Sequence, residues 1–183
     1  MTRLGAIFAG GQARRFGSDK AAALLDGRPL LDHVAARLAA QVDALVVVGR
    51  DWPGMERVDD RPEAGLGPLG ALAGALTHAA RTGFTDVLTS GCDLPDIPGD
   101  LAQMLAPGPA VVKDLPLLGL WPATLAGDLL RHLAETDDRS MRGWIAQSGA
   151  RAVTLPQALS NINTPQDLAA LADFRRGDRR SSP

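Results

Sequence analysis

Short apolar runs alternate with segments of helical periodicity along most of this chain. The apolar runs predict strands at Leu4–Ala9, Ala44–Val48, Glu56–Val58, Thr85–Thr89, Ala110–Val112, Leu117–Leu120 and Ala152–Leu155. Helices are predicted from Pro29 onward, at Pro68–Ala80, Leu101–Leu105, Ala123–Glu135 and Ser140–Gln147, and from Thr164 onward. This alternation favours a single three-layer α/β/α domain with a Rossmann-like, mostly parallel sheet. We place the domain at residues 1–174 and expect the polar, basic residues 175–183 to be disordered.

The composition is that of a globular protein and gives no sign of a polyanionic partner. Apolar residues make up 45% and charged residues 22% of the 183 residues, and 19 Lys and Arg stand against 21 Asp and Glu. Nucleic-acid and membrane-surface binders usually carry a basic excess, so we expect neither partner. The N-terminal apolar run is too short for a signal peptide, and Cys92 has no second cysteine for a disulfide. These features predict a cytoplasmic protein.

The first predicted strand ends in Phe8-Ala9-Gly10-Gly11 and leads into a basic loop that continues to Lys20. Ligands of open α/β sheets lie at the carboxyl ends of strands, and glycines let backbone N–H groups approach phosphate oxygens. Arg14, Arg15 and Lys20 add positive charge. The spacing matches neither GxxxxGK[ST] nor GxGxxG, so neither an ATPase nor a dehydrogenase is indicated. The loop therefore predicts another kind of phosphate site; the alternative is a glycine turn with a solvated basic surface.

This loop resembles the signature AGGxxxRxGxDK of the sugar-nucleotide-type nucleotidyltransferases, in particular that of the molybdenum cofactor guanylyltransferases. The related cytidylyltransferases for molybdopterin typically carry Ala-Ala-Gly where this chain has Ala9-Gly10-Gly11. The resemblance implies the nucleotidyltransferase fold, with the nucleotide bound by the loop from Phe8 to Gly11 and by Lys20. It also implies that Arg15 supports the transferred or leaving phosphates.

Asp93 lies shortly after the strand predicted at Thr85–Thr89. Its surroundings, Cys92-Asp93-Leu94-Pro95-Asp96-Ile97-Pro98, resemble the family's CDxPxxP segment. A carboxylate there can bind Mg²⁺, which takes one or two protein carboxylates plus phosphates. We therefore predict that Asp93 is the metal ligand and touches the nucleotide; the alternative is an Asx turn. For Asp96 the plain loop role is favoured, and Cys92 is interpreted as a small apolar filler because no histidine partner is identifiable.

A second acidic position precedes a glycine-rich helix start. Asp59-Asp60 stand before Gly65-Leu66-Gly67-Pro68-Leu69, which resembles the family's Asp followed by Gly-Pro-Leu. A carboxylate can accept hydrogen bonds from both guanine donors, N1–H and N2–H₂. Asp60 is the matching position for nucleotide binding. Whether it contacts the base or positions another group stays open here, and solvated turn acids are the alternative.

The C-terminal segment supplies a third motif. Ser160-Asn161-Ile162-Asn163-Thr164-Pro165-Gln166-Asp167-Leu168 matches the family's NxNTPxDL, and Thr164 with Asp167 forms a capping-box-like helix start. Alternation in an extended backbone points Asn161 and Asn163 the same way, so both could order metal waters or substrate phosphate. Relatives have a longer hairpin where this chain has residues 113–116. Lys113, Arg139 and Arg142 are the cations left to hold an anionic acceptor, although each alone could be a solvated charge.

The resemblance implies an enzyme that transfers GMP from GTP to the phosphate of molybdopterin or molybdenum cofactor, with Mg²⁺ as the cofactor. A molybdoenzyme or a cofactor-delivery protein is then a plausible partner. Two alternatives stay open: a related cytidylyl- or sugar-phosphate nucleotidyltransferase, and a non-catalytic GTP-binding protein of cofactor maturation. Relatives also commonly carry an Asn at the end of the second strand, where this chain has Val48-Gly49.

Overall fold

A seven-stranded sheet lies at the centre of the computed structural model, which describes residues 1–10, 16 and 19–181, with residues 178–181 as backbone only. The strand order is β5-β4-β1-β6-β8-β7-β9. The strands are β1 (Arg3–Phe8), β4 (Ala44–Val48), β5 (Glu56–Val58), β6 (Asp86–Gly91), β7 (Ala110–Val112), β8 (Leu115–Pro122) and β9 (Arg151–Val153). Every pairing is parallel except the two made by β8, which runs antiparallel to β6 and β7. The predicted mostly parallel sheet is confirmed.

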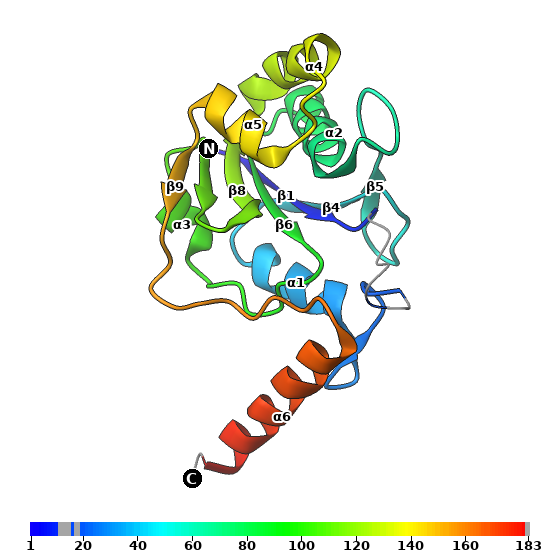
Figure 1. Cartoon of the computed structure of the whole chain (residues 1–183), viewed down its shortest axis with the longest axis vertical. Helices are drawn as coiled ribbons and strands as arrows, with labels where there is room; N and C mark the ends of the chain where they lie inside the picture. Colours follow the sequence, from blue (N-terminus) through cyan, green and yellow to red (C-terminus); the bar gives the residue numbers. More distant parts are fainter. Residues whose placement is uncertain (11–15, 17–18, 182–183) are drawn as a thin grey trace.

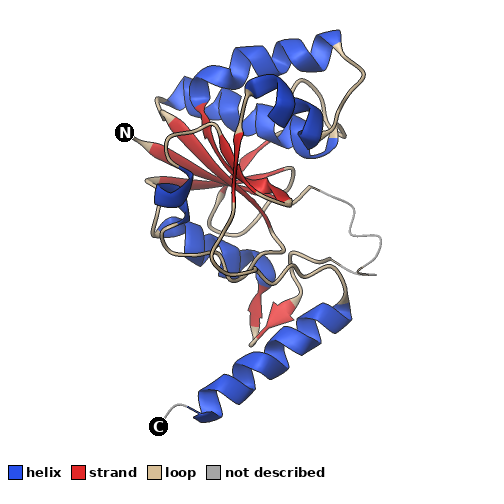
Figure 2. Cartoon of the chain, turned by 60° about the vertical axis from the view of Figure 1, so that its left-hand side comes forward, coloured by secondary structure: helices blue, strands red, loops and turns tan. Residues whose placement is uncertain are grey.

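Helices cover both faces of the sheet and give the predicted three layers (Figures 1 and 2). One face carries α2 (Gly67–Thr82), η1 (Ala123–Leu125), α4 (Ala126–Glu135) and α5 (Met141–Ser148), and the other carries α1 (Leu30–Ala39) and α3 (Leu101–Leu105). Strand β1 shows why both faces need cover. Its Leu4, Ala6 and Phe8 lie in the core under α2, whereas Ile7 lies in the core over α1. A strand buried on both sides is a continuous apolar run, as the sequence has it.

A small hairpin and the last helix form a separate cluster below this body. Strands β2 (Leu24–Leu25) and β3 (Arg28–Pro29) pair around a turn in which Asp26 and Gly27 both have positive φ. Helix α6 (Pro165–Ser181) packs on this hairpin through Leu171 and then projects from the molecule (Figure 1). The sequence analysis did not predict the hairpin, although Asp-Gly between apolar residues is its usual signal.

Helix α6 also differs from the expectation that residues 175–183 are disordered, because it runs to Ser181. Arg175 forms ion pairs with Asp96 and, at 3.5 Å, with Asp26. Arg176 pairs with Asp173 one turn earlier. Arg175 and Arg176 thus tie the first part of this segment into ionic contacts, which its composition alone did not indicate.

The chain order places a ligand site at the carboxyl end of β1. From β1 the chain crosses through α1 to β4 on one side, and from β5 it crosses through α2 to β6 on the other. Such a reversal of direction leaves a crevice beyond the strand ends, where α/β proteins bind their ligands. Among the described residues no helix is long and apolar enough to cross a membrane.

Candidate functional site

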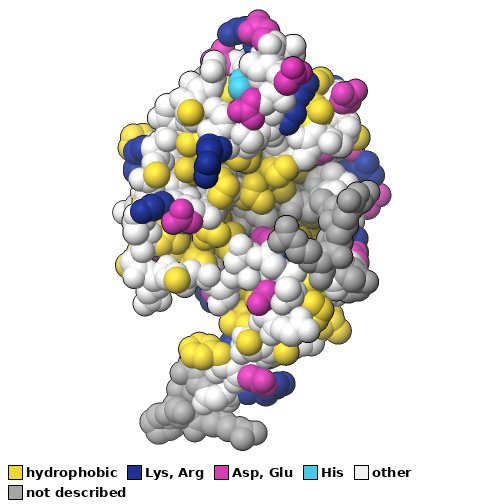
Figure 3. Space-filling view, in the orientation of Figure 1, with side chains coloured by type: hydrophobic (Ala, Val, Ile, Leu, Met, Phe, Trp, Pro, Cys, Tyr) yellow, Lys and Arg dark blue, Asp and Glu magenta, His cyan; other side chains and the backbone are white. Residues whose placement is uncertain are grey.

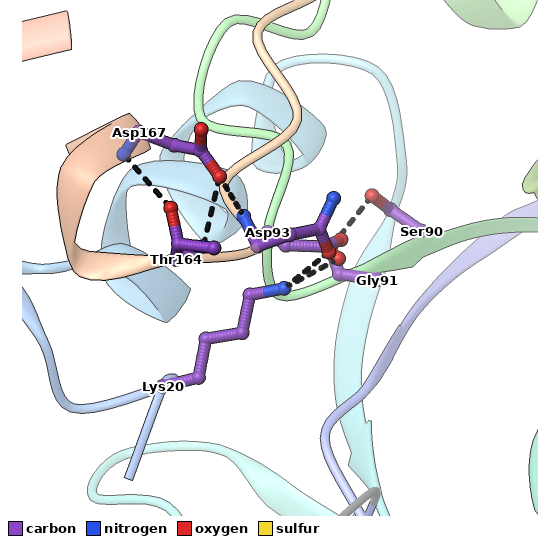
Figure 4. Close-up of polar contacts among 7 residues, drawn as sticks. Lys20, Ser90, Gly91, Asp93, Thr164 and Asp167 are labelled. Carbon is purple, nitrogen blue, oxygen red and sulfur yellow. Dashed lines mark hydrogen bonds and ion pairs between the residues drawn. The ribbon is translucent and has the colours of Figure 1, made fainter. Parts of the chain in front are cut away.

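The ammonium group of Lys20 lies between two polar groups from distant parts of the chain (Figure 4). Its Nζ donates to Asp93 Oδ2 at 2.9 Å and to Asn163 Oδ1 at 3.1 Å. The side chains of Lys20 and Asp93 are only 14% and 21% exposed, so this ion pair is partly withdrawn from water. The predicted nucleotide-binding lysine and the predicted metal-binding carboxylate are therefore in direct contact, and Asn163 joins them.

The position of Asp93 depends on two neighbours. Asp93 follows the end of β6, and its carbonyl oxygen accepts a hydrogen bond from the Ile162 N–H at 3.0 Å, which ties the segment before α6 to the strand end. A Cβ on Gly91 would lie 2.5 Å from Asp93 Oδ1. Only glycine leaves room for the carboxylate at that place. The sequence analysis did not single out Gly91.

The helix start beside the site has the predicted cap. The Asp167 N–H donates to Thr164 Oγ1 at 3.1 Å, and the Thr164 N–H donates back to Asp167 Oδ2 at 2.8 Å. Asp167 Oδ2 also accepts from the Asn163 N–H at 2.9 Å, and this bond is the main cause of the lowered pKa of the Asp167 carboxyl. The cap thus fixes the backbone of Asn163, whose side chain faces Lys20.

On the other side of the crevice, Gly10 touches the loop after β4. A Cβ on Gly49 would lie 2.8 Å from the Gly10 Cα and 3.6 Å from Asp60 Oδ1, and Gly49 has φ +88. Val48 itself is buried in the core. The position where relatives carry Asn therefore has no space for a side chain here. Burial raises the pKa of the Asp60 carboxyl; a hydrogen bond from the Gly65 backbone opposes this, and the Asp59 charge adds to it. Gly10 and the Asp60 carboxylate thus both lie close to Gly49.

Cys92 is confirmed as a packing residue. It packs against the apolar core on the α1 side of the sheet. Burial raises its pKa to about 11, and the neighbouring Asp93 charge acts in the same direction. A thiol with such a pKa is almost entirely protonated near neutrality and is a poor nucleophile.

The oxygen atoms around Lys20 suit a hard cation. Asp93 offers carboxylate oxygens and Asn163 an amide oxygen, which are ligands that Mg²⁺ accepts. Within the described ranges, no group of three or more His, Cys, Asp or Glu side chains could enclose a metal ion. A cation here would take most of its ligands from water and from a bound phosphate, which is how Mg²⁺ usually binds.

The remaining predicted residues are placed as follows. The side chains of Phe8 and Ala9 are buried, so only their backbone can meet a ligand, while Gly11 and Arg15 lie outside the described residues. Asn161 lines a hollow beside α6 together with Leu171 and Phe174. Lys113, Arg139 and Arg142 are exposed and, in the described part of the chain, form no ion pair. Asp96 is engaged by Arg175, in keeping with the loop role favoured for it.

Cationic and anionic side chains are interspersed on the face shown in Figure 3. In the crevice, sequence reasoning overlooked one cationic residue. Arg50, just after β4, binds Asp19 with both terminal nitrogens, at 2.7 and 2.6 Å. The only sequence signal was its place after a strand end.

Comparison with known protein families shows which proteins this chain resembles. Residues 5–153 match the family described as "MobA-like NTP transferase domain". The chain is 37% identical over 193 residues to a molybdenum cofactor guanylyltransferase of Cereibacter sphaeroides, with 97% of this chain and 100% of the relative covered. It is 34% identical to the molybdenum cofactor guanylyltransferase of Rhizobium leguminosarum bv. trifolii, with 90% and 89% covered.

Solved structures share the fold. Molybdopterin-guanine dinucleotide biosynthesis protein A from Archaeoglobus fulgidus matches with a TM-score of 0.76 at 22% identity, over 95% of this chain and 99% of that one. A CMP:2-keto-3-deoxy-manno-octonic acid synthetase in complex with CTP matches with a TM-score of 0.68 at 13% identity, over 97% and 100%. At these identities the likeness concerns the fold alone.

Proposed function

Because the chain belongs to the MobA-like NTP transferase family, whose members are nucleotidyltransferases, we propose that it transfers GMP from GTP to the terminal phosphate of molybdopterin or of its metal-bound form. The products are the guanine dinucleotide cofactor and pyrophosphate. The observation that carries the proposal is the Lys20 ammonium 2.9 Å from the Asp93 carboxylate at the carboxyl ends of the strands. Near-full-length similarity to enzymes named molybdenum cofactor guanylyltransferase supports GTP and molybdopterin as the substrates.

The reaction needs positioning and charge neutralisation more than proton transfer. An oxygen of the acceptor phosphate attacks the α-phosphorus of GTP in line, a new P–O bond forms, and the bond to the bridging oxygen of pyrophosphate breaks. The acceptor phosphate is already ionised near neutral pH, so no strong general base is required. Lys20, with Arg15 from the glycine loop, neutralises the triphosphate, and the loop backbone holds it in place.

Asp93 would hold Mg²⁺, with Asn163 as a second oxygen donor or as a partner of a metal-bound water. When bound, the ion neutralises charge on the phosphate oxygens. Asp93 and Asn163 both contact Lys20 in the structure. Asp93 and Asn163 would therefore hold the cation close to the Lys20 ammonium.

Asp60 would read the guanine base. Its carboxylate lies close to Gly49, which itself touches Gly10, and burial raises its pKa. The N1–H and N2–H₂ groups of guanine supply two donors side by side. Inosine triphosphate lacks the 2-amino group, so the wild-type enzyme should prefer GTP to ITP. Asp60→Asn should lose that preference, and an unchanged GTP-to-ITP ratio would remove Asp60 from base recognition.

We assign the acceptor side to Asn161, Asn163, Lys113, Arg139 and Arg142. The three cations are exposed and available to an anionic ligand. A cytoplasmic location and hand-over of the product to a molybdoenzyme or a delivery protein complete the proposal.

The deciding experiment is pyrophosphate release from each of GTP, CTP, ATP and UTP with molybdopterin present. We expect release with GTP. Release with CTP instead would indicate a cytidylyltransferase, and the same assay with sugar phosphates tests the sugar-nucleotide alternative. GTP binding without pyrophosphate release would favour a non-catalytic protein of cofactor maturation.

A further inference from the structure

Arg50 and Asp19 form a bidentate ion pair between two loops at the carboxyl edge of the sheet. Arg50 comes shortly after β4, and Asp19 immediately precedes Lys20. Arg50 Nη1 donates to Asp19 Oδ1 at 2.7 Å, and Nη2 donates to Oδ2 at 2.6 Å. Two parallel bonds fix the plane of the carboxylate as well as its distance, which a single bond does not.

Both ends of the pair are held by further contacts. The Arg50 guanidinium lies 5.3 Å from the centre of the Trp52 ring, and Trp52 Nε1 donates to Asp32 Oδ1 on α1 at 2.7 Å. Asp19 Oδ1 also accepts from the Ala21 N–H at 3.1 Å, so the Asp19 side chain closes a turn around Lys20. The hydrogen bonds from Arg50 are the main cause of the lowered pKa of Asp19. The turn that carries Lys20 is thereby tied to β4 and to α1.

The pair is better suited to positioning than to stability. Arg50 is 31% and Asp19 45% exposed, and ion pairs so open to water contribute little to folding. The Lys20 side chain has several rotatable bonds, so its ammonium stays at Asp93 and Asn163 only if its backbone is fixed. A shift of about 1 Å in such a group can cost roughly a hundredfold in rate.

We propose that Arg50 is a positioning residue for nucleotidyl transfer: through Asp19 it holds the turn that places the Lys20 ammonium at Asp93. The activity part of this inference rests on the proposed function. In this account Arg50 acts through Asp19, to which both of its terminal nitrogens donate, and not by binding phosphate itself. The placement of Lys20 is a property of the protein without substrate and can be measured separately.

Lys20 placement is measured by limited acetylation with an amine-reactive ester, followed by peptide mass spectrometry. The chain carries lysine only at positions 20 and 113, so exposed Lys113 is an internal reference. In the wild type, Lys20 should react several-fold more slowly than Lys113. Arg50→Ala and Asp19→Asn should both raise Lys20 acetylation toward that of Lys113. Arg131→Ala, which removes an exposed ion pair on α4, should leave the ratio unchanged.

Measurements of activity distinguish between Arg50 as a positioning residue and Arg50 as a direct phosphate ligand. Arg50→Ala should lower kcat by roughly tenfold to a hundredfold, and Arg50→Lys should restore part of the lost kcat. In a Lys20→Met background, Arg50→Ala should cause little further loss of kcat. A full additional loss in that background would overturn the inference in favour of direct phosphate binding. Unchanged Lys20 acetylation in folded Arg50→Ala and Asp19→Asn, checked by circular dichroism, would overturn it outright. No transfer by the wild type would contradict the proposed function alone.

Discussion

The contact between Gly49 and Gly10 offers a sharp test of how the glycine loop is held. Gly49→Ala would place a Cβ 2.8 Å from the Gly10 Cα, and ordinary C···C contacts are about 3.5–4.0 Å. One of the two backbone segments must therefore move by roughly 0.7–1.2 Å. Gly49 also has φ +88, so alanine carries a left-handed strain of about 1–2 kcal/mol. Forcing the contact apart adds about 1–3 kcal/mol.

Gly54→Ala is the matched control. Gly54 has φ +76, and a Cβ there would meet nothing within 4 Å. The free energy of unfolding of this variant should therefore fall only by the left-handed strain of alanine, about 1–2 kcal/mol. The difference between the two variants isolates the contact with Gly10. Both free energies of unfolding are measured by urea titration followed by tryptophan fluorescence.

The same displacement should reach the nucleotide. A shift near 1 Å in Gly10 should raise KM for GTP and lower kcat/KM by up to roughly a hundredfold. Gly54→Ala should keep wild-type kinetics in the pyrophosphate-release assay. If Gly49→Ala matched Gly54→Ala in both stability and kcat/KM, the close packing of the two loops would not matter for binding, and the reasoning would be refuted.

Further predictions concern the cleft and the neighbouring Cys92. Lys20→Met should lower turnover by roughly 10²–10³, the scale for removing one charged stabiliser, and wild-type pyrophosphate release would contradict its role. Asp93→Asn should require more Mg²⁺ for half-maximal activity, because a neutral amide binds the ion less well; an unchanged metal titration would exclude Asp93 as ligand. The raised pKa of Cys92, about 11 against 9.0, predicts that iodoacetamide alkylation stays slow until the pH approaches 11. Because the pKa of the thiol is higher in the folded protein, the stability that the protonated thiol contributes is fully present below pH 9.0 and is lost as the pH rises through about 11. Rapid alkylation near neutral pH would show that Cys92 is not buried in this way.

Much of the fold was predictable because its signals are local. The strands at Ala44–Val48 and Glu56–Val58 and the helix at Leu101–Leu105 have the predicted bounds, since apolar runs and turn residues act over a few positions. The cap formed by Thr164 and Asp167 was predictable for the same reason. The β2–β3 hairpin was missed although its signal was present, because each of its strands has only two residues.

The candidate site was predictable only in its parts. The sequence by itself determined that a glycine loop with Lys20, an acid after a strand and an asparagine before a capped helix occur in this chain. The sequence could not determine that these side chains contact one another, because Lys20 and Asp93 are separated by 73 positions and Lys20 and Asn163 by 143. Only the strand order β4-β1-β6 and the packing of the segment before α6 on Asp93 bring them together. The same holds for Arg50 with Asp19 and for Arg175 with Asp96. Side-chain pairs of this kind depend on how distant elements pack, whereas strands, turns and caps depend on neighbours along the chain.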